Sequence, residues 1–130
     1  GEPALSPQEA QARFEALAAQ QRHCIYLAEL QGQPVGTFAL TFVGGLAHSA
    51  RDSCIVEDVV VAPQRRGSGI GTRMMAFAMR ECARRGCYKL VLSSHLERDS
   101  AHRFYENLGF RKHGFSFLIE RQAFDGAVPP

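Results

Sequence analysis

The sequence contains no tryptophan, only three tyrosines and no apolar run long enough to cross a membrane. A transmembrane helix needs about 18 or more consecutive apolar residues, so a membrane-spanning protein is excluded. Basic side chains outnumber acidic ones only slightly, 15 against 13, and they are not interleaved with aromatic residues. A nucleic-acid-binding surface is typically more basic, so we expect neither a nucleic acid nor a membrane as partner.

The four cysteines lack the spacing of a metal site or a redox motif. Cys24, Cys54, Cys82 and Cys87 form no CxxC pair and lie within apolar runs. We therefore expect reduced, buried thiols, no disulfides and no metal site. The first residues have neither the basic nor the apolar region of a signal peptide, so we expect a cytoplasmic protein.

The composition that remains is that of a globular domain. Hydrophobic residues make up 45% of the 130 positions. This length suits one core, and we predict a single domain over residues 1–130.

The N-terminal half has the pattern of a helix followed by a β-hairpin. Ser6 can cap a helix, Pro7 suits its first turn and Glu9 completes a capping box, so we predict a helix to about Gln21. Two strands and a loop that holds His48 and Arg51 follow, with predicted ranges 24–30, 35–43 and 44–52.

The C-terminal half begins with a βαβ unit. An apolar strand, a glycine-rich turn, an amphipathic helix that Gly86 ends and a second strand predict a parallel strand pair with a right-handed crossover. A shorter helix follows, and then one bent strand or two short ones. The predicted ranges are 55–61, 67–71, 72–85, 88–93, 99–108 and 110–121.

The glycine-rich turn is a candidate anion site. Gly67, Gly69 and Gly71 precede a helix whose N-terminal N–H groups attract negative charge, and Arg66 and Thr72 add donors. The spacing fits neither a P-loop nor a dinucleotide fingerprint. A plain tight turn, with glycines for positive φ, is the alternative.

Three segments resemble the GCN5-related N-acetyltransferase (GNAT) family. Arg66-Gly67-Ser68-Gly69-Ile70-Gly71 fits its Arg/Gln-x-x-Gly-x-Gly motif. Residues 59–63 resemble its fourth strand, and residues 101–110 resemble its closing helix-to-strand motif. Together the matches run from about Ile55 to Phe110 in the order of the family.

The resemblance implies an α/β (α+β) fold of the GNAT type. The central sheet would be mixed and mostly antiparallel, with one parallel, splayed strand pair and helices on both faces. The cofactor-binding part would span about residues 54–110. Family members usually begin with a strand, whereas this chain starts with a helix, so we expect the first strand to be missing.

The resemblance also implies acetyl-CoA as co-substrate. The glycine turn would bind the pyrophosphate, and the strand before it would hold the pantetheine arm, with the N–H of Val59 or Val61 polarising the thioester carbonyl. The implied cofactor-binding residues are Val59, Val60, Val61, Arg66, Gly67, Ser68, Gly69, Ile70, Gly71 and Thr72.

Three residues are candidates for proton transfer. Tyr105 matches the tyrosine with which family members protonate the departing thiolate, although it could simply cap the core. Glu57 or Asp58 could take the proton of the acceptor amine, or both could pair with arginines. Strand neighbours face opposite sides, so only one can point into the acceptor cleft unless a bulge intervenes. We favour Glu57, acting directly or through water.

The acceptor is inferred from narrower resemblances, to glucosamine-6-phosphate and aminoalkylphosphonate N-acetyltransferases. These imply a small primary amine, with a phosphate or phosphonate as its anionic group, that attacks directly in a ternary complex. The candidate substrate-binding residues are His48, Arg51, His95 and His102. The family's usual asparagine, seven residues before the tyrosine, is Arg98 here, which weakens the case for cofactor contacts from that loop.

We expect an N-acetyltransferase that forms a homodimer. Two alternatives stay open, a protein or peptide N-acetyltransferase and a non-catalytic module that binds acyl-CoA.

Overall fold

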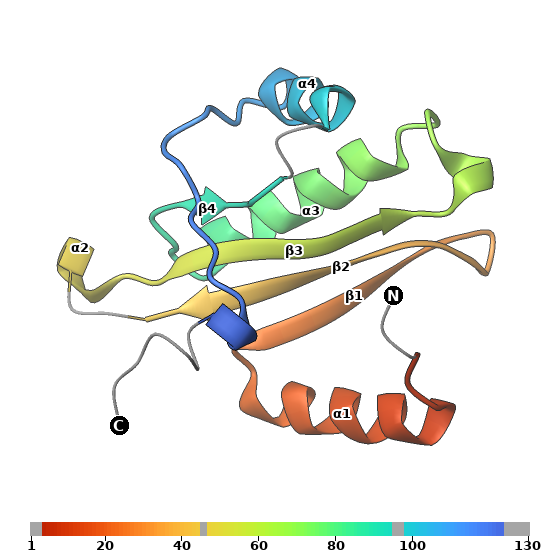
Figure 1. The fold of residues 1–130 in the computed structure, drawn as a ribbon. Helices are drawn as coiled ribbons and strands as arrows, with labels where there is room; N and C mark the ends of the chain where they lie inside the picture. Colours follow the sequence, from red (N-terminus) through yellow and green to blue (C-terminus); the bar gives the residue numbers. More distant parts are fainter. Residues whose placement is uncertain (1–3, 45–46, 95–97, 124–130) are drawn as a thin grey trace. The chain divides into compact units, whose positions relative to one another are not determined.

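The computed structural model describes residues 4–44, 47–94 and 98–123. The chain forms two compact units, residues 1–92 and 93–130. Figure 1 shows the elements, which in chain order are α1 (Pro7–Gln20), β1 (His23–Leu30), β2 (Gln33–Val43), α2 (Ala47–Ala50), β3 (Ser53–Val61), the 3₁₀ helix η1 (Pro63–Arg65), α3 (Ile70–Arg84), β4 (Leu90–Val91) and α4 (Asp99–Asn107).

The first unit is built on a four-stranded mixed sheet with the order β1-β2-β3-β4. β1 and β2 pair as an antiparallel hairpin, and β2 and β3 are also antiparallel. β3 and β4 are parallel and are joined through α3, which confirms the predicted βαβ unit. The mixed, mostly antiparallel sheet is therefore the predicted one, although β4 is much shorter than the expected strand over residues 88–93.

Helix α1 begins as the sequence predicts. The Ser6 hydroxyl accepts a hydrogen bond from the Glu9 N–H, and the Glu9 carboxylate accepts one from the Ser6 N–H, so both halves of the capping box are present. Pro7 occupies the first turn, where its missing N–H costs nothing. The helix ends at Gln21, which has a left-handed φ of 58°.

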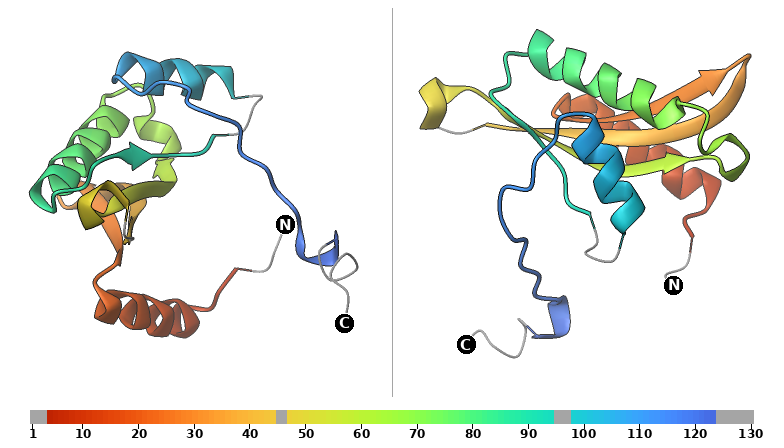
Figure 2. Two further views of the ribbon diagram at one scale, coloured as in Figure 1. Left: turned by 90° about the vertical axis from the view of Figure 1, so that its left-hand side faces the viewer. Right: turned by 90° about the horizontal axis from the view of Figure 1, so that it is seen from above.

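Helix α3 packs along one face of the sheet (Figure 2). Its apolar stripe faces the side chains of β2 and β3 that point to the same side, which buries both. The core of this layer consists of Phe38, Leu40, Phe42, Cys54, Val56, Ile70, Met74, Met75, Ala78 and Cys82. The predicted amphipathic character of this helix is therefore confirmed, although Phe77 and Met79 are each 37% exposed.

At Gly36 of β2, α3 and the sheet approach each other closely. A Cβ at this position would lie 2.8 Å from Met74 Sδ and 3.0 Å from the backbone oxygen of Val60. Real Cβ atoms do not come so close to backbone, so a side chain here would push α3 and β3 away from β2.

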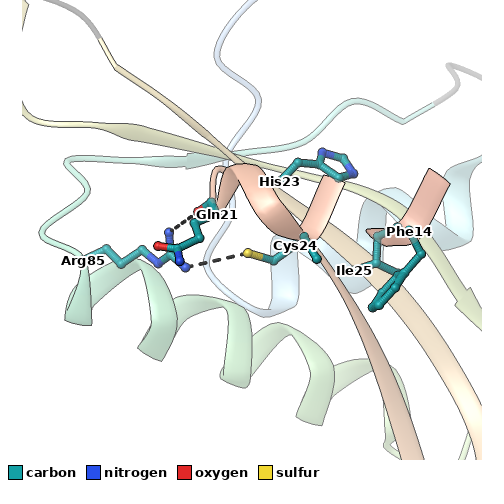
Figure 3. Close-up of a pocket in the computed structure, with 7 residues that line it drawn as sticks. Phe14, Gln21, His23, Cys24, Ile25 and Arg85 are labelled. Atoms are coloured by element: carbon teal, nitrogen blue, oxygen red, sulfur yellow. Dashed lines mark hydrogen bonds between the residues drawn. The ribbon is translucent and has the colours of Figure 1, made fainter. Parts of the chain in front are cut away.

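Arg85, at the end of α3, links three elements of the first unit. Its guanidinium donates to the Gln21 carbonyl oxygen at 3.0 Å and to Cys24 Sγ at 3.7 Å (Figure 3). It also lies 3.9 Å from the ring centroid of Phe42. The same figure shows Phe14 of α1 beside Ile25, which points to the face of the sheet opposite α3. Helices therefore approach both faces of the sheet.

The predicted loop over residues 44–52 contains α2, which is a left-handed turn. His48, Ser49 and Ala50 have φ values of 55°, 60° and 58°. Such values are uncommon for L-residues other than glycine. The His48 ring stacks on Tyr88 with a centroid distance of 3.9 Å, which holds the turn against the chain before β4.

The second unit contains α4 and an extended segment. The expected strand over residues 110–121 is wrong, because residues 110–120 have no regular secondary structure and a short helical turn occupies 121–123. Phe115, Phe117 and Leu118 are 87%, 92% and 84% exposed. Alternating apolar residues form a strand only when a neighbouring strand supplies hydrogen bonds and cover, and no strand of the described residues pairs with this segment.

Two further expectations concern thiols and membranes. All four cysteines are free. Cys54 and Cys82 are buried in the core, as predicted, whereas Cys24 and Cys87 are only partly buried. Burial raises the pKa of the Cys54 thiol well above its usual value, which keeps it neutral and unreactive. Within the described ranges, no helix has the length and apolar character needed to span a bilayer.

Candidate active site

A β-bulge in β3 lies at the centre of the predicted site. Glu57 pairs with Ala39 and Val60 pairs with Thr37, so two residues of β3, Asp58 and Val59, stand opposite one residue of β2. Asp58 is the residue that adopts a left-handed conformation, with φ of 55°. Aspartate tolerates this region better than most residues, because its short polar side chain can bond locally.

The bulge changes the choice between the two acids. Strict alternation would place Glu57 and Asp58 on opposite faces, but the extra residue interrupts that alternation. Both side chains are exposed. The rule that only one acid can point into an acceptor cleft therefore does not hold at this position, and the structure leaves both available.

Two backbone hydrogen bonds locate the consequence of the bulge along β3. The Cys54 N–H donates to the Lys89 carbonyl oxygen on the β4 side, whereas the Ala62 N–H donates to the Val35 carbonyl oxygen on the β2 side. N–H groups of successive strand residues point to alternate sides, so without the bulge these two even-numbered residues would point the same way. Counting back from Ala62, the N–H groups of Val61 and Val59 point away from β2.

β3 extends well past its pairing with β4. The parallel ladder consists of Cys54 with Leu90 and Ile55 with Val91, and β4 ends there. β3 continues to Val61. Within the first unit, the N–H groups of Val59 and Val61 are thus directed to the side where the strand pair has opened, which is the splay that the resemblance implies.

The glycine turn follows directly after this open strand. Gly67 and Gly69 have φ values of 80° and 86°, and no heavy atom lies within 4 Å of a Cβ built on either. Glycine is therefore needed here for the backbone conformation and not for packing. Gly69 is the N-cap of α3, and no side chain caps the helix.

An uncapped helix start is suited to an anion. The first turn of α3 contains no acidic residue, and its N–H groups carry the positive end of the helix dipole. Arg66 and Thr72 are exposed beside it, and the Ser68 hydroxyl donates to the Arg65 carbonyl oxygen. Ile70 differs from the other predicted residues, because its side chain is in the core and only its backbone can contribute.

Tyr105 lies on α4, in the second unit. Its ring is half-buried between Phe104 and Phe110, with centroid distances of 5.1 and 5.7 Å. Burial raises the pKa of Tyr105 above its ordinary value, and the opposing effect of Arg98 is smaller. The phenol therefore holds its proton at neutral pH, as a general acid must.

The predicted acceptor-binding residues come from separate parts of the chain. His48 and Arg51 precede β3, and the Arg51 guanidinium lies 5.8 Å from the ring centroid of Tyr88. From Ser53 to Val59 a strand covers about 20 Å, so these two residues lie at the opposite end of β3 from the open N–H groups (Figure 1). His102 is on α4 in the second unit, and His95 lies outside the described residues.

Two features of the site were not predicted from the sequence. The position of the bulge depends on the register with β2, and only the tolerance of aspartate for positive φ hints at Asp58. The contact of His48 and Arg51 with Tyr88 joins residues far apart in the chain, and no local signal predicts it. Among residues 4–44, 47–94 and 98–123, no group of three or more His, Cys, Asp or Glu side chains could hold a metal ion.

An open parallel strand pair followed by a glycine turn and an uncapped helix defines a class of acyltransferase fold, and sequence comparison agrees. The sequence model of the acetyltransferase (GNAT) family matches residues 2–110. The chain belongs to this family. The order of strand, glycine turn and helix noted in the sequence is thus that of the family.

Two curated relatives have similar sequences. Glucosamine 6-phosphate N-acetyltransferase of Trypanosoma brucei brucei is 33% identical over 89 residues, which is 68% of this chain and 58% of the relative. Aminoalkylphosphonate N-acetyltransferase of Salmonella typhimurium is 34% identical over 91 residues, which is 70% of this chain and 58% of the relative. The chain therefore aligns with less than two thirds of the length of either protein.

Solved structures show the same fold. A protein from Agrobacterium tumefaciens strain C58 that is assigned to the acetyltransferases matches with a TM-score of 0.87 and 35% identity, covering 93% of this chain and 84% of its own. Glucosamine-6-phosphate N-acetyltransferase of Arabidopsis thaliana matches with a TM-score of 0.82 and 24% identity, covering 93% and 82%. The latter likeness concerns the fold alone.

Proposed function

We propose that this protein transfers the acetyl group of acetyl-CoA to the primary amine of a small molecule that carries a phosphate or phosphonate. The observation that carries the proposal is the open edge of β3, where the N–H groups of Val59 and Val61 point away from β2 beyond the end of β4. The uncapped glycine turn continues directly from this edge. Together they offer backbone donors for an acyl-pantetheine arm and for a pyrophosphate.

The residues present fit acetyl-CoA. Gly67 and Gly69 leave open space where a side chain would hold a phosphate away, and α3 has no side-chain cap that would compete for its first N–H groups. We assign the pyrophosphate to residues 66–72 and the arm to residues 59–61. When bound, acetyl-CoA supplies an acetyl thioester, and the Val59 or Val61 N–H stabilises negative charge on its carbonyl oxygen.

Proton transfer falls to three side chains. An ammonium has no lone pair, so the acceptor amine must first lose a proton. We assign the removal of this proton to the Glu57 carboxylate, directly or through water, with Asp58 as the alternative. We assign protonation of the departing thiolate to the Tyr105 hydroxyl, whose burial keeps it protonated. The amine attacks directly while both substrates are bound.

Substitutions separate the two proton-transfer roles. Tyr105→Phe should lower kcat about 100-fold, with little change in the KM for acetyl-CoA. Glu57→Gln should lower kcat most at low pH, where less of the amine is deprotonated without help. Steady-state rates from pH 6 to 9 measure both, and an unchanged pH–rate profile in Glu57→Gln would transfer the role to Asp58.

The acceptor class is supported by the names of the relatives, which act on glucosamine 6-phosphate and on aminoalkylphosphonates. We propose that His95 and His102 contribute cationic or hydrogen-bonding groups to acceptor binding, whereas His48 and Arg51, at the opposite end of β3, are not assigned this role. We also propose that the protein is cytoplasmic. We further propose a homodimer, because Phe115, Phe117 and Leu118 expose apolar surface for a second subunit to cover. Light scattering at micromolar concentration tests the dimer.

A panel of acceptor amines tests the function. Thiol release from acetyl-CoA is measured with glucosamine 6-phosphate and an aminoalkylphosphonate, each beside its matched amine without phosphorus, and with lysine-containing peptides. We expect release with the phosphorus-bearing amines and much slower release with their matched controls. Release with peptides alone would contradict the acceptor class. Thermal stabilisation by acetyl-CoA without release from any amine would instead indicate a binding module.

A further inference from the structure

A cavity in the first unit lies at the β1 edge of the sheet, which is the edge opposite the open part of β3. It has a volume of about 440 Å³ and is formed by β1, the start of β2 and the exposed side of α3. In the sheet order β1-β2-β3-β4, β2 separates it from β3. The N–H groups of Val59 and Val61 point away from β2, and therefore away from this cavity.

The floor of the cavity is aromatic. The rings of Tyr26, Phe38 and Phe77 form a cluster with centroid distances of 5.1, 5.0 and 6.1 Å. Phe38 is buried, but Phe77 is 37% exposed. A partly exposed aromatic ring offers surface for stacking, because offset-stacked and edge-to-face pairs stabilise beyond their buried area.

Two arginines flank Phe77 on the same face of α3. Arg73 precedes Phe77 by four residues and Arg80 follows it by three, spacings that make side chains neighbours on a helix. Both line the cavity and both are exposed. In the described part of the chain, no hydrogen bond or ion pair involves the guanidinium group of Arg73 or Arg80. The nearby carboxylate of Glu81 pairs with Arg84 and Arg85 instead.

A smaller cavity of about 220 Å³ contains an arginine whose guanidinium is used in contacts within the fold. It lies at the other end of α3 and contains Arg85, which already donates to Gln21 and Cys24 and covers Phe42 (Figure 3). Arg85 is therefore occupied by the fold. Arg73 and Arg80 have no such role, so their positive charge is available to a ligand.

We propose that the larger cavity is a binding site for a planar aromatic anion, separate from the acetyl-transfer site. The ring stacks on Phe77, and a carboxylate, sulfonate or phosphate on that ring pairs with Arg73 or Arg80. Guanidinium groups suit such oxyanions because their donors match two oxygens at once. This site does not depend on the proposed acetyl transfer.

The remaining charge in the cavity orients the ligand. Glu29 lines it from β1, opposite the helix that carries the arginines. The anionic group is therefore directed towards α3, and the uncharged edge of the ring towards β1. Burial raises the pKa of Tyr26 to about 12, so its phenol is neutral at physiological pH and adds no negative charge to the floor.

Binding of anilinonaphthalene sulfonate tests the proposal. This probe combines fused aromatic rings with a sulfonate, and its fluorescence rises in an apolar site. We expect saturable binding to one site, with the Kd raised about tenfold or more in Arg80→Glu and in Arg73→Glu, because each removes a charge-assisted contact. Glu29→Gln should tighten binding about threefold. Arg13→Glu, a matched charge reversal on the exposed surface of α1, should leave the Kd unchanged.

Three outcomes would overturn the proposal. Displacement of the probe by saturating acetyl-CoA would place it in the acetyl-transfer site. Equal loss of binding in Arg13→Glu would reveal a general charge effect. Equal affinity for naphthalene sulfonate and cyclohexane sulfonate, measured by calorimetry, would show that no ring stacks on Phe77. If acetyl-CoA fails to bind at all while the probe binds as expected, the proposed function fails and this site stands.

Discussion

The two ends of α3 are built in opposite ways. At the C-terminal end the Gly86 N–H donates to Ala83 O and the Cys87 N–H to Cys82 O, and Arg85 ties the helix to neighbouring elements. At the N-terminal end Gly69 provides no side chain, and the first turn has no cap. One end thus uses its polar groups for stability, and the other leaves them for a ligand.

The largest effect should come from removing the closed end. Arg85→Ala loses hydrogen bonds to Gln21 and Cys24 and the cation–π contact with Phe42, so we expect a loss of about 3 kcal/mol in the free energy of unfolding. Arg84→Ala is the matched control. Its side chain is 67% exposed, so its loss should have a much smaller effect than the loss of Arg85. Urea unfolding measures both, and equal effects would contradict the special role of Arg85.

The next effect concerns the approach of α3 to the sheet near the open end. Gly36→Ala places a methyl group against Met74 and the Val60 backbone, so we expect a loss of about 2 kcal/mol. Gly44→Ala offers a control, because its Cβ meets only side-chain atoms, the nearest at 2.8 Å being the mobile end of Arg22. Thermal unfolding should show a clear drop in Tm for the first variant and little for the second. A reversed order would mean that β2 can move away freely.

A pair of glycine substitutions compares the two ends directly. Gly69→Ala and Gly86→Ala both place a Cβ at positive φ, 86° and 72°, with no neighbour within 4 Å, so each should cost about 1 kcal/mol of stability. Only Gly69→Ala should weaken acetyl-CoA binding, by about tenfold, through the lost approach to the pyrophosphate. Calorimetric titration distinguishes them. Equal losses of affinity would show that the open end has no special part in binding.

The smallest effect is a pH dependence at the closed end. Hydrogen bonding from Arg84 is the main cause that lowers the pKa of Glu81 below its ordinary 4.5. Because the folded pKa is the lower one, the stabilisation is complete above 4.5 and is lost as the pH falls through the folded value. Glu81→Gln should therefore cost about 0.5 kcal/mol at pH 7, and this cost should shrink as the pH falls below 4.5. A difference that persisted in acid would indicate a contribution from packing instead.

Local signals in the sequence were sufficient for most of the first unit. The capping box at Ser6, the hairpin and the helix before Gly86 depend on residues close in the chain, and all are present. The glycine turn was recognisable for the same reason, since positive φ at Gly67 and Gly69 is a property of the local backbone. The parallel strand pair joins more distant residues, but it follows from the order of strand, helix and strand.

Features that depend on pairing between distant segments were not predictable. The length of β4 is set by how far β3 stays beside it, and the apolar pattern of residues 110–121 says nothing about whether a partner strand is present. The place of the extra residue in β3 depends on its register with β2. The contacts of Arg85 could not be predicted from the sequence, because its three partners lie just after α1, in β1 and in β2, far from it in the chain.

The bulge at Asp58 acts on β3 as a one-residue phase shift. Before it, even-numbered residues direct their N–H groups towards β4, as Cys54 does; after it, odd-numbered residues do. If β3 kept its length and paired regularly with β2 through Asp58, a single phase would run along the whole strand and the Val60 N–H would turn outward in place of its neighbours. A regular strand of the same length would then present a different set of donors at the open edge, so the extra residue determines which amides are offered.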